Sequence, residues 1–157
     1  MAKPVHLEQS HTYSTGVEHA FDVVLATPLP EVFSRRYAAI PAIREVRDQG
    51  GAWGTVGQSR TIVLADGGTM REELTQVDRP HSFGYAITDI TGPMKLLAAS
   101  ADGLWTFDAA GSGVEVTWAW ELRPASPVAA LVMPVFARFW RGYARRAMEQ
   151  LEALLPV

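Results

Sequence analysis

The sequence contains no cysteine among its 157 residues. This absence excludes disulfide bonds, thiolate metal sites and cysteine nucleophiles. A chain of this length can bury roughly 70% of the surface that it exposes when unfolded, so it can fold without a disulfide or a metal ion. We therefore expect a single domain over residues 1–157.

The sequence also lacks an excess of positive charge and a long apolar run. Its formal net charge is −3, so no overall attraction draws the protein to nucleic acid or to an anionic membrane. No segment reaches the ~18 apolar residues of a membrane-spanning helix, and residues 1–10 lack the apolar core of a signal peptide. These features predict a cytoplasmic protein without nucleic-acid partners or stable membrane insertion, and they leave monomer and homodimer open.

Motifs for metal binding or nucleophilic catalysis are missing as well. The four histidines have no carboxylate or second histidine at ligand spacing on a shared element. The glycine-rich segment 50–54 joins two predicted strands and opens no helix, so it is a turn and not a phosphate-binding loop. Serine and histidine occur outside any nucleophile-elbow context. We therefore predict no metal site, no cofactor and no catalytic residue.

Aromatic residues are abundant instead. Five tryptophans, six phenylalanines and four tyrosines make up 10% of a chain in which only 20% of the residues are charged. The interior must therefore be large or partly hollow.

Turn signals divide the middle of the chain at short, regular intervals. The segments between them alternate in polarity or are rich in β-branched and aromatic residues, which is typical of strands. We predict strands near residues 17–26, 43–49, 56–65, 69–77, 82–90, 97–108 and 114–122. Six of them follow one another without a helix-length gap, which indicates an antiparallel meander in an α+β fold.

Two helices are predicted from cap and proline positions. A short helix follows the first strand, with Thr27 as its cap and Pro28 at its first position. A long helix covers residues 127–155, with Ser126 as its cap and Pro156 ending it. Because the final thirty residues form this helix, a lipocalin-like barrel is disfavoured. The apolar residues of the long helix recur at three- and four-residue steps, which predicts that one face of this helix is covered. These residues are Phe136, Trp140, Tyr143, Ala147, Leu151 and Leu154.

The hairpin around residues 66–68 places two charged residues on an apolar face. If Ala65 pairs with Thr69 across a three-residue loop, Arg60 and Glu72 lie at diagonal positions that long side chains can bridge. Burial of these charges is costly unless they are paired or solvated in a cavity. Two interpretations stay open, a ligand-orienting pair and a structural ion pair. The residues on this apolar face of the hairpin are Arg60, Ile62, Leu64, Met70, Glu72 and Leu74.

The last predicted strand turns two indoles, those of Trp118 and Trp120, toward the long helix. Trp105 on its partner strand joins them if the connecting loop is 110–113. A one-residue slip would turn Leu104 inward instead. We favour the first register.

The order of these elements resembles the helix-grip fold of the START and Bet v 1-like (SRPBCC) superfamily, in particular its bacterial polyketide cyclase/dehydrase-like branch. The resemblance is carried by residues 27–33, 56–60, 66–68 and 72–78 and by Trp105 and Trp118. It implies a curved seven-stranded antiparallel sheet wrapped around the C-terminal helix, with two short helices after strand 1.

The resemblance also implies a cavity for lipids, hormones, polyketides or other hydrophobic molecules. It places Arg60 and Glu72 where plant hormone-receptor relatives have polar groups that line the cavity. Those relatives carry a lysine where this chain has Ile43 and Arg44, so their acidic ligands are not carried over.

The predicted ligand-binding residues combine this polar pair with aromatic and aliphatic neighbours from the inward faces. The tyrosines among them could turn their hydroxyl groups into the cavity or toward its rim. The set is Tyr37, Arg60, Ile62, Glu72, Tyr85, Ile87, Trp105, Trp118, Phe136, Trp140 and Tyr143.

Three functions follow from this picture. The first hypothesis is binding of a small hydrophobic or aromatic molecule between the sheet and the long helix. The second is an aromatase/cyclase-like enzyme that closes a poly-β-keto chain, with Arg60 stabilising an enolate. The third is an interaction module without a small ligand.

Overall fold

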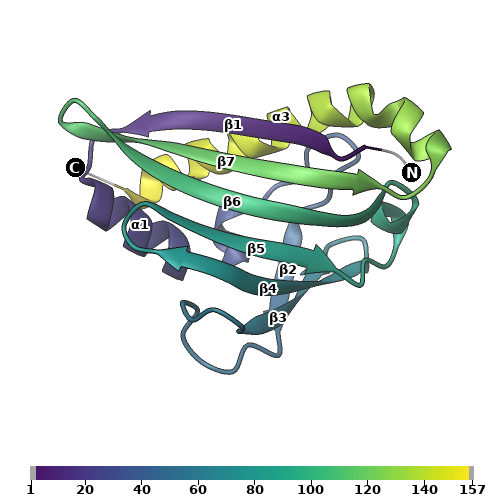
Figure 1. Ribbon diagram of the computed structural model, residues 1–157, viewed down its shortest axis with the longest axis horizontal. Helices are drawn as coiled ribbons and strands as arrows, with labels where there is room; N and C mark the ends of the chain where they lie inside the picture. The colour runs from purple at the N-terminus through teal and green to yellow at the C-terminus, as the bar shows by residue number, and fades with distance from the viewer. Residues whose placement is uncertain (1–2, 156–157) are drawn as a thin grey trace.

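Residues 3–155, which the computed structural model describes, form one antiparallel sheet and a long helix that crosses its concave face (Figure 1). The seven strands lie in the order β1-β7-β6-β5-β4-β3-β2. The elements along the chain are β1 (Val5–Tyr13), α1 (Val17–Ala26), α2 (Leu29–Val32), β2 (Ile43–Arg47), β3 (Ser59–Leu64), β4 (Thr69–Asp78), β5 (Ser82–Thr88), η1 (Pro93–Leu96), β6 (Ala98–Ala110), β7 (Gly113–Pro124) and α3 (Pro127–Leu154). This arrangement confirms the predicted helix-grip architecture.

The long helix α3 begins as its sequence predicts. The Ser126 hydroxyl oxygen accepts a hydrogen bond from the backbone N–H of Ala129 at 3.1 Å, and Pro127 occupies the first turn. The helix ends at Leu154, and Pro156 lies outside the described residues. Its predicted inward residues are buried, with the exception of Leu154, which is half-buried. Figure 1 shows α3 passing behind β1 and β7.

The prediction of a first strand at residues 17–26 is wrong, because this segment is helix α1. Its buried residues Ala20, Phe21 and Val24 recur at helical spacing, which the nearby β-branched residues obscured. The first strand is β1, which pairs with β7 along its whole length. Only Leu7 and Tyr13 of β1 are fully buried, so its strand pattern is weak.

The two short helices predicted after strand 1 are α1 and α2, but their caps differ from the prediction. Thr27 ends α1, since its backbone N–H bonds to the carbonyl of Val23 at 2.9 Å. Pro28 then serves as the N-cap of α2, not as its first residue. The chain therefore uses this dipeptide to change direction between the two helices.

The other six predicted strands are all present, and one predicted register needs correction. Trp105 lies opposite Trp118, which confirms the favoured register of the last hairpin. In the hairpin of β3 and β4, however, Arg60 lies directly opposite Glu72, two residues away from the predicted pairing. Ala65 belongs to the turn, where the N–H of Gly67 bonds to the carbonyl of Leu64 at 3.0 Å. A shift by two residues keeps every side chain on its predicted face.

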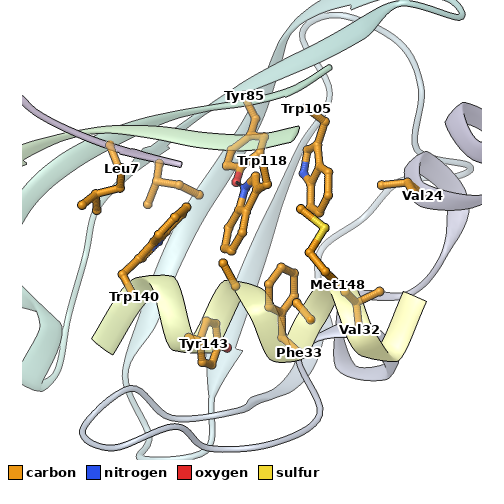
Figure 2. Packing of buried hydrophobic residues seen from close by; sticks show 14 of the residues in the cluster. Leu7, Val24, Val32, Phe33, Tyr85, Trp105, Trp118, Trp140, Tyr143 and Met148 are labelled. Atoms are coloured by element: carbon orange, nitrogen blue, oxygen red, sulfur yellow. Dashed lines mark hydrogen bonds between the residues drawn. The ribbon is translucent and has the colours of Figure 1, made fainter. Parts of the chain in front are cut away.

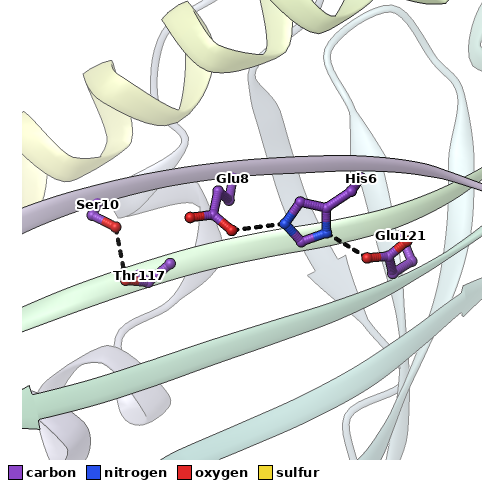
Figure 3. Close-up of polar contacts among 5 residues, drawn as sticks. All are labelled: His6, Glu8, Ser10, Thr117 and Glu121. Carbon is purple, nitrogen blue, oxygen red and sulfur yellow. Dashed lines mark hydrogen bonds and ion pairs between the residues drawn. The ribbon is translucent and has the colours of Figure 1, made fainter.

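The outer face of the sheet is polar where β1 and β7 pair (Figure 3). His6 contacts Glu8 at 2.7 Å through Nε2 and Glu121 through Nδ1. Hydrogen bonds to these two carboxylates raise the pKa of His6 above its usual value. His6 and Glu8 lie two residues apart on β1, a pairing that the sequence-based prediction did not include. Among residues 3–155, no group of three or more such side chains is arranged to hold a metal ion.

The apolar character of α3 is limited to its inward side and to part of its exposed first half. No helix within residues 3–155 is long and apolar enough to cross a membrane.

We predict that the His6 imidazole titrates above 6.5, its ordinary pKa. Because the folded state raises this pKa, the stabilisation from the imidazolium is complete below the unfolded-state pKa and is lost as pH rises through the folded-state value. An NMR pH titration of the ring protons measures it. Glu121→Gln should lower the midpoint, and a wild-type midpoint at or below 6.5 would contradict the paired geometry.

Candidate functional site

An apolar pocket lies between the concave face of the sheet, α3 and the two short helices, with a cavity volume of about 80 Å³. All five tryptophans of the chain line it: Trp53, Trp105, Trp118, Trp120 and Trp140. Figure 2 shows Trp105 and Trp118 reaching from the sheet toward α3, and Trp140 rising from the helix to meet them. Ten of the 24 residues that line the pocket are aromatic, and all but two of the others are apolar.

The free volume is smaller than the sequence suggests. Pockets that hold drug-sized ligands measure about 300–1,000 Å³, whereas one water molecule takes roughly 30 Å³ of liquid. The indoles themselves fill the space. Trp118 stacks on Trp105 with centroids 5.5 Å apart and lies 4.6 Å from the Trp140 ring. A ligand larger than a few heavy atoms must therefore displace side chains.

Tyr85 links two of these indoles through its hydroxyl group. Its oxygen accepts hydrogen bonds from Nε1 of Trp118 at 2.7 Å and from Nε1 of Trp120 at 2.8 Å. The tyrosine ring lies over Gly103, where an added Cβ would stand 2.0 Å from Cζ of Tyr85. Burial raises the pKa of Tyr85 well above its usual value, so the phenol keeps its proton at neutral pH.

Arg60 and Glu72 form a buried ion pair in the pocket wall, with 6% and 4% of their surfaces exposed. Nε of Arg60 donates to Oε1 of Glu72 at 2.6 Å, and Nη1 donates to Oε1 of Gln49 at 3.0 Å. The guanidinium carbon lies 3.8 Å from the centroid of the Trp53 ring. Burial raises the pKa of the Glu72 carboxyl, and the Arg60 charge opposes that shift.

The loop between β2 and β3 carries Trp53 to this ion pair. The side chain of Gln58 holds the loop, since its Oε1 accepts from the N–H groups of Gly54 and Thr55 at 2.8 and 2.6 Å. Its Nε2 donates to the carbonyl of Ala52 at 2.9 Å. The glycine-rich segment is a turn, as predicted, and it also supplies a pocket residue that the sequence analysis did not select. The signal for this residue in the sequence was a tryptophan inside an otherwise polar turn.

The predicted ligand-binding residues line the pocket with one exception. Tyr37 lies outside it, where its ring covers Gly142 and the Arg146 guanidinium stands 5.3 Å from its centroid. The Tyr143 hydroxyl is occupied, because it donates to the carbonyl of Pro41 at 3.0 Å. Tyr85 is thus the predicted tyrosine whose hydroxyl group meets the aromatic wall.

Further wall residues come from the short helices and their connections and are absent from the predicted set. Phe33 follows α2 and lies 5.0 Å from the Trp118 ring, centroid to centroid. Trp120 was placed on the inward face of β7 but left out of the predicted set, and the structure puts it in the wall. Inward alternation alone was a sufficient signal for Trp120.

We predict that Glu72→Ala lowers the free energy of unfolding by about 3–5 kcal/mol, because it leaves the Arg60 charge buried without its partner. The matched control is Glu73→Ala on the outer face of the same strand, where the contact with Arg71 is half-exposed and 3.2 Å long. This variant should lose at most about 1 kcal/mol. Urea denaturation measures both changes, and equal losses would contradict the assignment of a buried ion pair.

A family model described as polyketide cyclase/dehydrase and lipid transport matches residues 4–156 of the chain. A search of curated protein sequences finds no match.

Solved structures share the fold at low sequence identity. Major latex-like protein 151 from Panax ginseng has a TM-score of 0.68 and 15% identity, over 99% of this chain and 100% of that one. Ara h 8.0201 has a TM-score of 0.66 and 14% identity, over 94% and 98% of the two chains. Protein Ms6760 from Mycobacterium smegmatis has a TM-score of 0.60 and 19% identity, over 96% and 90%.

Proposed function

Because the chain belongs to the polyketide cyclase/dehydrase and lipid transport family, we propose that it binds a small hydrophobic or aromatic molecule between the sheet and α3. One observation carries this proposal: an apolar pocket whose wall contains every tryptophan of the chain. Flat apolar molecules gain most from such a wall, since indole faces offer large contact areas and favour offset stacking.

The ligand is either very small or enters by moving side chains. The pocket is partly open, and it is bounded by Met94 of η1 as well as by Phe33 and Phe136. Methionine adapts its shape at low cost because it is unbranched. Movement of these three side chains would widen the pocket without breaking the strand pairing.

An enzymatic role ranks second. The cyclase hypothesis needs the Arg60 guanidinium to stabilise an enolate, but this group already bonds to Glu72 and Gln49 and is covered by the Trp53 ring. A ligand oxygen would have to share or replace one of these contacts. Binding requires no such change, so it is the simpler function of the same wall. A role as an interaction module ranks third, because the aromatic surface faces inward.

We predict that filling the pocket abolishes binding. Naphthalene, 2-naphthol and 1-decanol should each be tested at saturation, and at least one should raise the melting temperature of the wild-type protein, because a ligand that binds only the folded state stabilises it. Ile62→Phe adds volume inside the pocket and should remove this shift. Tryptophan fluorescence provides a second readout, since every indole lies in the wall.

The matched control is Thr61→Phe, the same side chain on the neighbouring, outward-facing position of β3. It should keep the wild-type shift. The proposal fails if none of the three probes stabilises the wild type, or if both variants respond alike.

A further inference from the structure

The indole N–H of Trp140 has no partner. Trp140 is 1% exposed and lines the pocket. Among the described residues 3–155, Nε1 of Trp140 is the one buried side-chain nitrogen or oxygen atom that makes no hydrogen bond. Buried polar groups in native proteins are nearly always bonded, because an unpaired donor loses its water without compensation. An acceptor that reaches this donor would restore the missing hydrogen bond.

Tyr85 supplies a second free donor to the same wall. A phenol oxygen has two acceptor lone pairs and one O–H donor. The two indole N–H groups of Trp118 and Trp120 take the lone pairs. The O–H hydrogen has no acceptor among residues 3–155, as the bonds of Tyr85 in the described part of the chain are these two.

The two donors belong to one aromatic cluster. The Trp140 ring lies 4.6 Å from the Trp118 ring and 5.9 Å from the Trp120 ring, centroid to centroid. Both of those indoles bond to the Tyr85 oxygen. Figure 2 shows Tyr85 and Trp118 reaching from the sheet, and Trp140 rising from α3 beside Trp118.

The charge around the cluster favours a neutral acceptor. The two charged residues of the pocket wall, Arg60 and Glu72, are already bonded to each other, so neither balances the charge of a ligand anion. An anion would also lose its hydration in an apolar pocket. A carbonyl oxygen accepts two hydrogen bonds without a charge, which matches the two donors.

We propose that the ligand carries an uncharged hydrogen-bond acceptor, a ketone-type carbonyl oxygen, which Trp140 Nε1–H and the Tyr85 O–H bind. This inference rests on the proposed binding function and specifies which ligands the pocket prefers. It makes Trp140 a specificity-determining residue and not only a packing residue.

Two probes of nearly equal shape test the proposal, cyclopentanone and methylenecyclopentane, in which a CH₂ group replaces the carbonyl oxygen. Titration of ¹⁵N-labelled protein by NMR reports both affinities and the five indole N–H signals. The ketone should bind about three- to tenfold more tightly. It should also move the Trp140 indole signal downfield, whereas the hydrocarbon should not.

Trp140→Phe removes the free donor, so the ratio of the affinities for the ketone and the hydrocarbon should fall toward one. Tyr37→Phe is the matched control, because it removes a polar atom from an aromatic side chain that lies outside the pocket, and it should keep the preference. If Trp140→Phe does not fold, the indole N–H signal of Trp140 in the wild-type protein tests the proposal alone. A downfield shift with the ketone supports the proposal, and no shift contradicts it.

Equal affinities for the two probes, with an unmoved Trp140 signal, would overturn the carbonyl inference and leave the binding proposal standing. If neither probe binds and none of the apolar probes above stabilises the protein, the binding proposal fails as well.

Discussion

The contact between the concave face of the sheet and α3 is made by large aromatic rings, and the rest of the structure depends on it. Trp118 lies at its centre, stacked on Trp105 and packed against Trp140. Indoles are rigid, so they fill the layer without closing every gap, and they bring N–H groups that need partners. The same layer therefore stabilises the fold, creates the pocket and introduces its polar groups. Arg60 and Glu72 stand in the wall of this pocket as a mutually bonded pair.

The parts that could be predicted from sequence are those in which local pattern and tertiary burial agree. The alternation along β7 turned Trp118 inward, and the tight turn at 110–113 set the register that places Trp105 beside it. Ser126 and the proline after it defined the start of α3. In the hairpin of β3 and β4 the faces were correct although the pairing was shifted by two residues, because side chains in a strand repeat with that period.

The parts that could not be predicted depend on partners distant in sequence. The strand β1 looks polar because only two of its side chains are fully buried, and its pairing with β7 defines it. The segment 17–26 satisfies both a strand and a helix pattern, and packing of Phe21 against Phe107 and Phe83 favours the helix. Trp53 reaches Arg60 only because Gln58 shapes the intervening loop. The unpaired N–H of Trp140 is visible only once the neighbouring rings are in place.

The central claim is that the aromatic layer encloses a dry, accessible space between the sheet and α3. Crystallography under xenon pressure tests it directly, because xenon occupies dry apolar cavities and scatters strongly. The account predicts a xenon atom in van der Waals contact with Trp118 and Trp140. A pocket without xenon, or one filled with ordered water molecules, would contradict it.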